Sequence, residues 1–265
     1  MNETTEAGSA CSPRREKCMR QRKPKNLSEK LNSCDALLVS EPEQYKGNWR
    51  PLFSRFDDEE VDISKSLSES KLFLEIGAGK GKFLLEKASS DRDGLYLGFE
   101  GRDSILLRAL EKTAEADLRN LLFSRYYVRD LLPVFATGEL NGIFLNFSDP
   151  WPKERHSRRR LTNPEYLKMY EYILAPGGFI EFKTDNRDFF AYSSDAIRDS
   201  AGFNLVAINE DLHCASSHSD PLAKGGDDVP PPDHSCLSKT AALSEYEERF
   251  IRWNRCIFYI KGLRI

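Results

Sequence analysis

The sequence predicts an α/β fold, a doubly wound, mostly parallel sheet with an antiparallel last strand. From about residue 70, short apolar runs alternate with stretches of helical periodicity, which is typical of parallel strands joined by crossover helices. A glycine-rich loop, GAGKG at 77–81, follows the first of these runs directly and opens the first helix. Sheets of this kind bind ligands at the carboxyl ends of their strands, so functional residues are expected there.

The predicted elements follow one another in strand and helix order. Six apolar runs are expected to form strands: KLFLEIG, LYLGFEG, LLFSRYYV, NGIFLNF, GGFIEFKT and FNLVAIN. Helices are expected in GKFLLEKAS and DSILLRALEKTAEADL, and at about 163–174 and 187–200. The terminal segment ERFIRWNRCIFYIKGLRI alternates loosely. It is expected to supply the antiparallel strand, because the connection before it is too short for another crossover helix.

Two segments fall outside this pattern. Residues 1–25 are polar and aperiodic and are rich in Lys and Arg, which predicts a flexible basic arm. Residues 26–265 are expected to form a single domain. Within it, residues 214–240 are rich in Pro, Gly, Ser and Asp and have no periodicity, so we predict a loop insertion there.

Composition narrows the class of protein. The chain has 265 residues and 40% hydrophobic content, enough for a large core. Its formal net charge is only −3, so only local clusters of Lys and Arg can indicate a polyanion partner. The absence of a long apolar run and of a secretory signal, together with six scattered cysteines, predicts a cytoplasmic protein with reduced thiols. No membrane association and no obligate protein partner are expected.

The glycine loop favours a particular cofactor. Gly77, Gly79 and Gly81 follow a G-x-G-x-G pattern, which does not fit the G-x-G-x-x-G of dinucleotide sites. Glu75 precedes the loop. An acid there suits S-adenosylmethionine, which carries a cationic sulfonium and an amino-acid tail instead of a pyrophosphate. The alternative is a tight turn between strand and helix that binds no ligand.

Further acids end the next strands. Glu100 follows the second strand, where a carboxylate can accept both ribose hydroxyls of an adenosine ligand. Asp130 follows the third strand and is a candidate to accept from the adenine amino group. The alternative for either residue alone is a helix cap or a solvated acid.

The segment NFSDPWPKERHSRRRL, residues 146–161, combines one acid with many cations. Prolines stiffen the loop around Asp149, so this carboxylate is positioned to accept from a purine, with Trp151 available for stacking. If the methyl acceptor is N7 of guanine, this nitrogen attacks with its free lone pair and no proton must leave first, so positioning by Asp149 matters more than a strong base. The cations suit phosphates, although a solvated charged loop is the alternative. They are Lys153, Arg155, Arg158, Arg159 and Arg160.

These motifs resemble those of the tRNA (guanine-N7-)-methyltransferase family. The resemblance covers most of residues 19–265 and includes MRQRKPKN, PEQYKGNW, EIGAGKGKF, GFEGR, the segment from Asn146 to Leu167, APGG, KTDN and SEYEERF. It implies a Rossmann-like class I methyltransferase domain. It also implies methyl transfer from S-adenosylmethionine to N7 of guanine at position 46, in the tRNA variable loop, with tRNA as partner.

The resemblance also implies residue roles. Asp149 is expected to be catalytic, and Glu75, Glu100, Asp130, Asp149 and the three loop glycines are expected to bind the cofactor. Substrate contacts are expected from Lys153, Asp185, Ser244, Glu245, Tyr246 and Glu247. RNA contacts are expected from Arg155, His156, Ser157, Arg158, Arg159 and Arg160. The residues alone would predict a surface helix at 244–250 and leave a helix cap as the alternative for Asp185. The family usually has Thr in place of Ser244.

Several features of the sequence favour or oppose other interpretations. The arm before residue 19 and the insertion have no counterpart in the family. His213, Cys214, His218, His234 and Cys236 lie in or beside the insertion, but their spacing matches no standard zinc site, so no metal is predicted. An RNA-binding protein without catalysis conflicts with the acids, and a nicotinamide oxidoreductase conflicts with the glycine spacing. A small-molecule methyltransferase leaves the cations unexplained.

Overall fold

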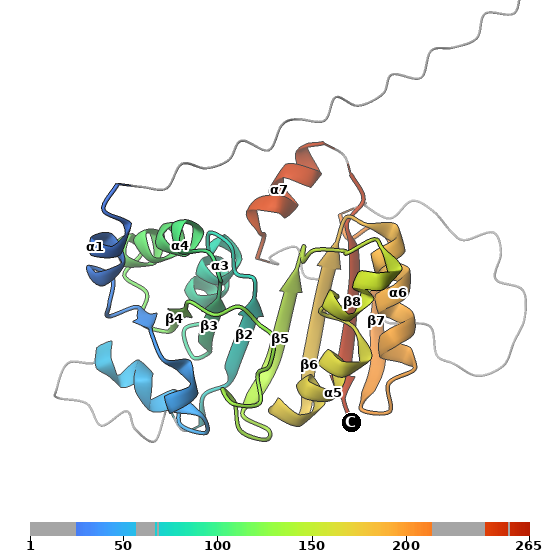
Figure 1. Cartoon of the computed structure of the whole chain (residues 1–265), viewed down its shortest axis with the longest axis horizontal. Helices are drawn as coiled ribbons and strands as arrows, with labels where there is room; N and C mark the ends of the chain where they lie inside the picture. The colour runs from blue at the N-terminus through green and yellow to red at the C-terminus, as the bar shows by residue number, and fades with distance from the viewer. Residues whose placement is uncertain (1–24, 57–66, 68, 214–241, 254) are drawn as a thin grey trace, which may run out of the picture.

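The computed structural model describes residues 25–56, 67, 69–213, 242–253 and 255–265. These residues form an eight-stranded sheet in the order β1-β4-β3-β2-β5-β6-β8-β7 (Figure 1). The first six strands in this order pair in parallel, and β8 pairs antiparallel with both β6 and β7. The predicted α/β class with an antiparallel last strand is confirmed. The strands are β1 (Leu38–Val39), β2 (Leu72–Ile76), β3 (Leu95–Phe99), β4 (Leu121–Ser124), β5 (Leu140–Asn146), β6 (Leu174–Thr184), β7 (Phe203–Asn209) and β8 (Phe258–Arg264).

Helices cover both faces of the sheet. Side chains of β2 show the two layers, because successive residues of a strand point to opposite faces. Leu72, Leu74 and Ile76 join an apolar cluster with residues of α5 and α6, whereas Phe73 joins a second cluster with residues of α3 and α4. The helices are α1 (Leu27–Asn32), α3 (Lys82–Ser90), α4 (Asp103–Glu115), α5 (Pro164–Ile173), α6 (Arg187–Arg198) and α7 (Glu245–Arg252), with 3-10 turns η1 (Pro42–Tyr45), η2 (Arg50–Phe56) and η3 (Glu154–Arg159).

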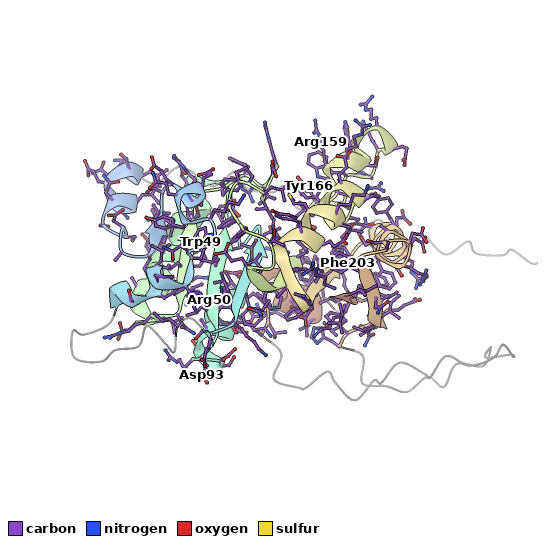
Figure 2. All side chains as sticks on the ribbon, turned by 90° about the horizontal axis from the view of Figure 1, so that it is seen from below. Trp49, Arg50, Asp93, Arg159, Tyr166 and Phe203 are labelled. Carbon is purple, nitrogen blue, oxygen red and sulfur yellow. The ribbon has the colours of Figure 1, made fainter. Side chains whose placement is uncertain are left out.

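The segment before β2 packs against the sheet. Trp49 is fully buried and its indole N–H donates to the carbonyl of Val134 at 3.0 Å. The carboxylate of Glu139 accepts from the backbone N–H groups of Gly47 at 2.9 Å and Ala136 at 2.8 Å. Figure 2 shows Trp49 within the body of the molecule. These contacts fix the segment that carries η1 and η2 to the rest of the domain.

Two sequence expectations need correction. The terminal segment begins with helix α7, and its strand starts only at Phe258. The reason is a capping box, in which Ser244 Oγ accepts from the Glu247 N–H and the Glu247 carboxylate accepts from the Ser244 N–H. In addition, LLFSRYYV is a strand only over β4. The two-residue strand β1 was not predicted, because so short a run carries no periodicity.

Some predictions fall on residues outside the described ranges. The basic arm lies there except for Lys25, and so does the insertion at 214–240. Both therefore stay predictions. Among the described helices, none has the length and apolar character needed to cross a bilayer.

Candidate active site

The glycine loop joins β2 to α3 and leaves open space. Gly77, Gly79 and Gly81 all have positive φ, the left-handed conformation that favours glycine. A Cβ added to Gly77 would meet no atom within 4 Å, whereas one added to Gly81 would lie 2.9 Å from Ala109 Cβ. Gly81 is thus required for packing of the loop on α4. Gly77 instead borders room for a ligand close to the backbone.

Glu75, at the end of β2, is a buried acid with one unused oxygen. Its side chain is 2% exposed, and Oε1 accepts from Asn146 Nδ2 on β5 at 2.8 Å. Its Oε2 is buried with no hydrogen-bond partner among the described residues. Burial raises the pKa of Glu75 to about 8, although the hydrogen bond from Asn146 opposes the shift. A cationic ligand group would find here an acceptor that the protein leaves unpaired.

Glu100, at the end of β3, supports the glycine loop. One carboxylate oxygen accepts from the Gly79 N–H at 3.2 Å, and the other accepts from the Arg102 N–H at 2.9 Å. Glu75 interacts electrostatically with Glu100, and also with Glu245 and Lys183. The structure therefore brings the acids of β2 and β3 together at one edge of the sheet, as expected for a doubly wound fold.

Asp130 lies apart from this contact network. Its side chain is exposed, and its Oδ1 accepts from the Leu132 N–H at 2.9 Å. Its carbonyl accepts from the Tyr126 hydroxyl at 2.8 Å. These bonds are those of a local turn, and the exposed carboxylate fits the alternative of a solvated acid that the sequence left open. Contact with adenine stays a prediction for this residue.

Asp149 lies in a loop with unusual backbone conformations. Phe147 and Trp151, on either side of it, have φ of 51° and 42°. For large side chains this conformation costs about 1–2 kcal/mol per residue, so surrounding contacts must hold the loop. Asp149 itself is exposed, and no described residue donates a hydrogen bond to it. The carboxylate is therefore available to a ligand at the carboxyl end of β5.

Arg160 supplies the contacts that hold this loop. Its Nε donates to the carbonyl of Pro150 at 3.2 Å, and its Nη2 donates to the carbonyl of Trp151 at 3.2 Å. The guanidinium carbon lies 4.3 Å from the ring centre of Tyr192 on α6, in a cation–π contact. Arg160 thus links Tyr192 of α6 to Pro150 and Trp151, the two residues that follow Asp149. These contacts already engage its guanidinium group.

The other cations of the segment face outward. Lys153, Arg155, Arg158 and Arg159 are exposed, and η3 carries the last three of them. Figure 2 shows Arg159 at the periphery of the molecule. The guanidinium of Arg159 lies 4.8 Å from the ring centre of Trp151, and His156 meets the same ring edge-on at 5.8 Å. His156 and Ser157 are half-buried, so the exposed charges form the surface available to a polyanion.

Helix α7 is attached to three other elements through its acids. Glu245 accepts from Lys112 of α4 at 2.7 Å, and Glu248 forms an ion pair with Lys82 of α3. Figure 1 shows α7 beyond the tips of the β2 and β5 arrows. The sequence reading of 244–250 as a helix is confirmed, and its acids face the protein.

The third acid of α7, Glu247, is fully buried. Its carboxylate accepts two hydrogen bonds from Lys183 of β6, at 2.9 and 3.0 Å, and lies 2.8 Å from His213 Nε2. Burial opposes its ionisation, but the His213 hydrogen bond and the charge of Lys183 outweigh burial and lower the pKa of Glu247. The Nε2 atom of His213 is thus paired with Glu247. The other four candidate zinc ligands lie outside the described residues.

Asp185 and Lys153 complete the set of predicted substrate residues. Asp185 follows β6 and is exposed, and its Oδ2 lies 3.9 Å from Arg255 Nη1. It does not cap α6, because the side chain of Asn186 does so by accepting from the Phe189 N–H at 2.8 Å. Lys153 precedes η3 and is exposed. Both side chains remain available for substrate.

Comparison with known proteins agrees with this geometry. Residues 69–259 match the family described as "Putative methyltransferase". A tRNA (guanine-N(7)-)-methyltransferase of Lachnoclostridium phytofermentans is 37% identical over 80% of this chain and 84% of its own length. The chain belongs to this methyltransferase family. A relative of the same name from Geobacillus thermodenitrificans is 34% identical over 93% of this chain and 98% of its own length.

Solved structures support the fold of this methyltransferase. The crystal structure of the 16S rRNA methyltransferase KamB has a TM-score of 0.52 and 14% sequence identity, and covers 78% of this chain and 94% of that chain. At this identity the likeness concerns the fold alone. It agrees with the mostly parallel sheet and its order of strands.

The residues of the methyltransferase fit S-adenosylmethionine. Glu75 Oε2 is an orphaned buried acceptor, suited to the ammonium group of the amino-acid tail. The space beside Gly77 admits close approach of a ligand to the backbone. Glu100 offers a carboxylate at the end of β3, where ribose hydroxyls are expected. We therefore expect Glu75, the glycine loop and Glu100 to hold this cofactor.

Sequence reasoning missed two residues of the methyltransferase site and one role of a predicted residue. Asn146 orients Glu75, and Lys183 pairs with Glu247. Arg160, predicted only to face RNA, also holds the Asp149 loop. Of these residues, only Asn146 could have been noticed in the sequence, since it is a polar residue at the end of the apolar run that forms β5. The role of Arg160 in RNA binding stays a prediction.

Replacing Arg160 tests its positioning role. We expect Arg160→Ala to lower kcat by about 10- to 100-fold, because the loop that carries Asp149 loses two backbone hydrogen bonds. Affinity for S-adenosylmethionine and the salt dependence of tRNA binding should stay close to wild type. Arg158→Ala is the matched control, since this exposed cation should affect tRNA binding and leave kcat unchanged. A flattened salt dependence with normal kcat would contradict the positioning role.

Proposed function

We propose that this chain transfers a methyl group from S-adenosylmethionine to the N7 atom of guanine at position 46, in the variable loop of tRNA. The observation that carries the proposal is the arrangement of side chains at the carboxyl ends of the strands. There, the buried acids Glu75 and Glu100 stand at the ends of β2 and β3, and the loop of the exposed Asp149, with the outward cations after it, follows the neighbouring strand β5. Family membership supports the reaction. The enzymatic class follows from the same membership.

The cofactor supplies an electrophilic methyl group on a sulfonium. The lone pair of guanine N7 forms the new N–C bond while the S–C bond breaks, so no proton leaves and the base acquires a positive charge. Asp149 orients the guanine and offsets this charge. Arg160 keeps the Asp149 loop in place, and the exposed cations hold phosphates of the tRNA.

Product mapping tests the proposed reaction. The full chain is incubated with labelled methyl donor and unmodified tRNA transcripts, and the modified nucleotide is located by cleavage at 7-methylguanine. We expect one methyl group per transcript in the variable loop, and none when guanine 46 is replaced by adenine. Transfer to a small molecule, or to another position of the tRNA, would refute the proposed substrate.

The cations predict a salt-dependent affinity. Each phosphate contact contributes a slope of about 0.7–0.9 to the dependence of log affinity on log salt. We expect Arg155→Ala with Arg158→Ala to reduce that slope by about 1.5 and to weaken tRNA binding at low salt, with unchanged affinity for S-adenosylmethionine. Arg198→Ala, at the far end of α6, is the matched control and should leave the slope unchanged. A slope equal to wild type in the double variant would remove these cations from the RNA surface.

The remaining assignments are proposals as well. The cytoplasm is the proposed compartment, supported by the family's tRNA substrate. Contacts of Lys153, Asp185 and residues 244–247 with the substrate are proposed from the resemblance. For Glu247, contact with guanine requires exchange or sharing of the Lys183 ion pair, because the carboxylate is fully buried.

A further inference from the structure

Helix α7 exposes aromatic rings and cations on the surface away from its paired acids. Tyr246 is 55% exposed and Trp253 is 48% exposed, with Phe250 packed between them at 6.5 and 6.2 Å between ring centres. Arg249 lies over the Trp253 ring at 5.1 Å, and Arg255 lies over the same ring at 5.7 Å. We call these five residues the α7 ring face. Exposed rings grouped in this way mark a binding surface more often than scattered ones do.

The α7 ring face is continuous with the loop of Asp149. The ring of Phe147, two residues before Asp149, lies 5.4 Å from Phe250 and 6.2 Å from Tyr246. Arg255 reaches back to Asp185 at 3.9 Å. The rings therefore lead from the candidate active site outward along α7 to Trp253.

Charge is segregated across this helix. The three acids Glu245, Glu247 and Glu248 are paired with lysines of α4, β6 and α3, respectively. The guanidinium groups of Arg249 and Arg255, by contrast, lie over the exposed ring of Trp253, and Arg255 also lies 3.9 Å from Asp185. Rings flanked by guanidinium groups suit bases flanked by phosphates, because bases stack on aromatic faces and phosphates attract cations.

We propose that the α7 ring face is a stacking platform for an unpaired nucleotide of the tRNA substrate, next to the target guanine. The inference rests on the proposed function and extends it to residues beyond the predicted substrate set. A base stacks on the Trp253 ring, and the guanidinium groups of Arg249 and Arg255, which lie over that ring in the free protein, turn to the adjoining phosphates. Sequence preference there is weak, since every base offers a π-face.

Replacing Trp253 tests the platform. Wild-type protein, Trp253→Ala and Trp253→Phe are titrated with a tRNA transcript and separately with S-adenosylmethionine, and kcat and KM for tRNA are measured. We expect Trp253→Ala to raise the Kd and KM for tRNA on the order of tenfold, with kcat and cofactor affinity unchanged. Trp253→Phe should recover most of the loss. Tyr172→Ala is the matched control, because Tyr172 is also exposed but lies in the last turn of α5, which ends just before β6 begins, at the opposite ends of the strands.

The outcomes separate this inference from the proposed function. If wild-type protein does not methylate tRNA, the proposed function fails before the variants are compared. If wild type methylates and Trp253→Ala binds tRNA like wild type, only the platform is refuted. The platform is equally refuted if Trp253→Ala changes the oligomeric state of the protein and not the tRNA affinity, since the face would then be a protein contact. Loss of cofactor affinity in both Trp253 variants would refute it too, because Trp253 would then act by holding α7.

Discussion

Asp149→Ala is expected to lower kcat for methyl transfer to tRNA by about a thousandfold. Binding of tRNA should be retained, because the phosphate contacts come from other residues. The reason is electrostatic: the carboxylate orients guanine and offsets the charge that the base acquires. Single-turnover kinetics with labelled cofactor measure the effect on the chemical step.

The surroundings of Asp149 make this variant interpretable. The carboxylate is exposed and no described residue donates a hydrogen bond to it, so its removal leaves no buried donor unpaired. The strained residues Phe147 and Trp151 keep their contacts, and so does Arg160. Loss of activity would then report on chemistry and not on folding.

Two further variants frame the result. Glu154→Ala removes an acid from the first turn of η3, five residues away, and should leave kcat within about twofold of wild type. Asp149→Asn keeps the shape and loses the charge, so its kcat should lie close to that of Asp149→Ala if charge dominates. Near-normal turnover of Asp149→Ala would show that the residue has no catalytic role.

Much of the fold could be predicted from the sequence, because the strands are buried. The runs that became β2, β3 and β5 are nearly continuous apolar segments, and Gly77, Glu100 and Asn146, respectively, mark their ends. The start of the last strand could not be predicted. Its preceding helix α7 depends on a capping box and on ion pairs with residues far away in sequence, such as Lys112 and Lys183. Alternation alone does not reveal such partners.

The same distinction applies to the site. Topology brings the carboxyl ends of β2 and β3 together, so the grouping of Glu75 and Glu100 follows from their place after each strand. The positioning role of Arg160 cannot be predicted from the sequence. The five cations between residues 153 and 160 look equivalent there, and only the folded turn at Trp151 directs one guanidinium group to the backbone carbonyls. Asp130 shows the converse, since an acid after a strand also serves a local turn.

Glu75→Gln is expected to have opposite effects on cofactor binding and on stability. The variant should bind S-adenosylmethionine about a hundredfold more weakly, because a neutral amide cannot offset the charge of the cofactor's ammonium group. Without cofactor, however, it should be more stable than wild type at pH 8, because it no longer buries an ionisable carboxyl. Calorimetric titration and thermal unfolding measure the two effects.

The pH dependence of wild-type stability has a defined sign. Burial raises the pKa of Glu75 from 4.5 to about 8, so the folded chain holds a proton there that the unfolded chain releases between these values. The contribution of this group is complete below pH 4.5 and is lost as the pH rises through 8, at up to about 1.4 kcal/mol per pH unit. Glu75→Gln should remove this slope. Asp188→Asn, an exposed acid of α6, is the control and should retain it.

Cofactor binding should show the reverse trend in wild type. If the ammonium group of S-adenosylmethionine requires an ionised Glu75, binding releases a proton, and affinity should rise between pH 6 and 7.5 by up to about tenfold per unit. The same titration of Glu75→Gln should be flat. A wild-type affinity independent of pH, together with a stable, tight-binding Glu75→Gln, would mean that the unpaired oxygen of Glu75 does not face the cofactor. The acid would then serve only to anchor Asn146 beneath the Asp149 loop.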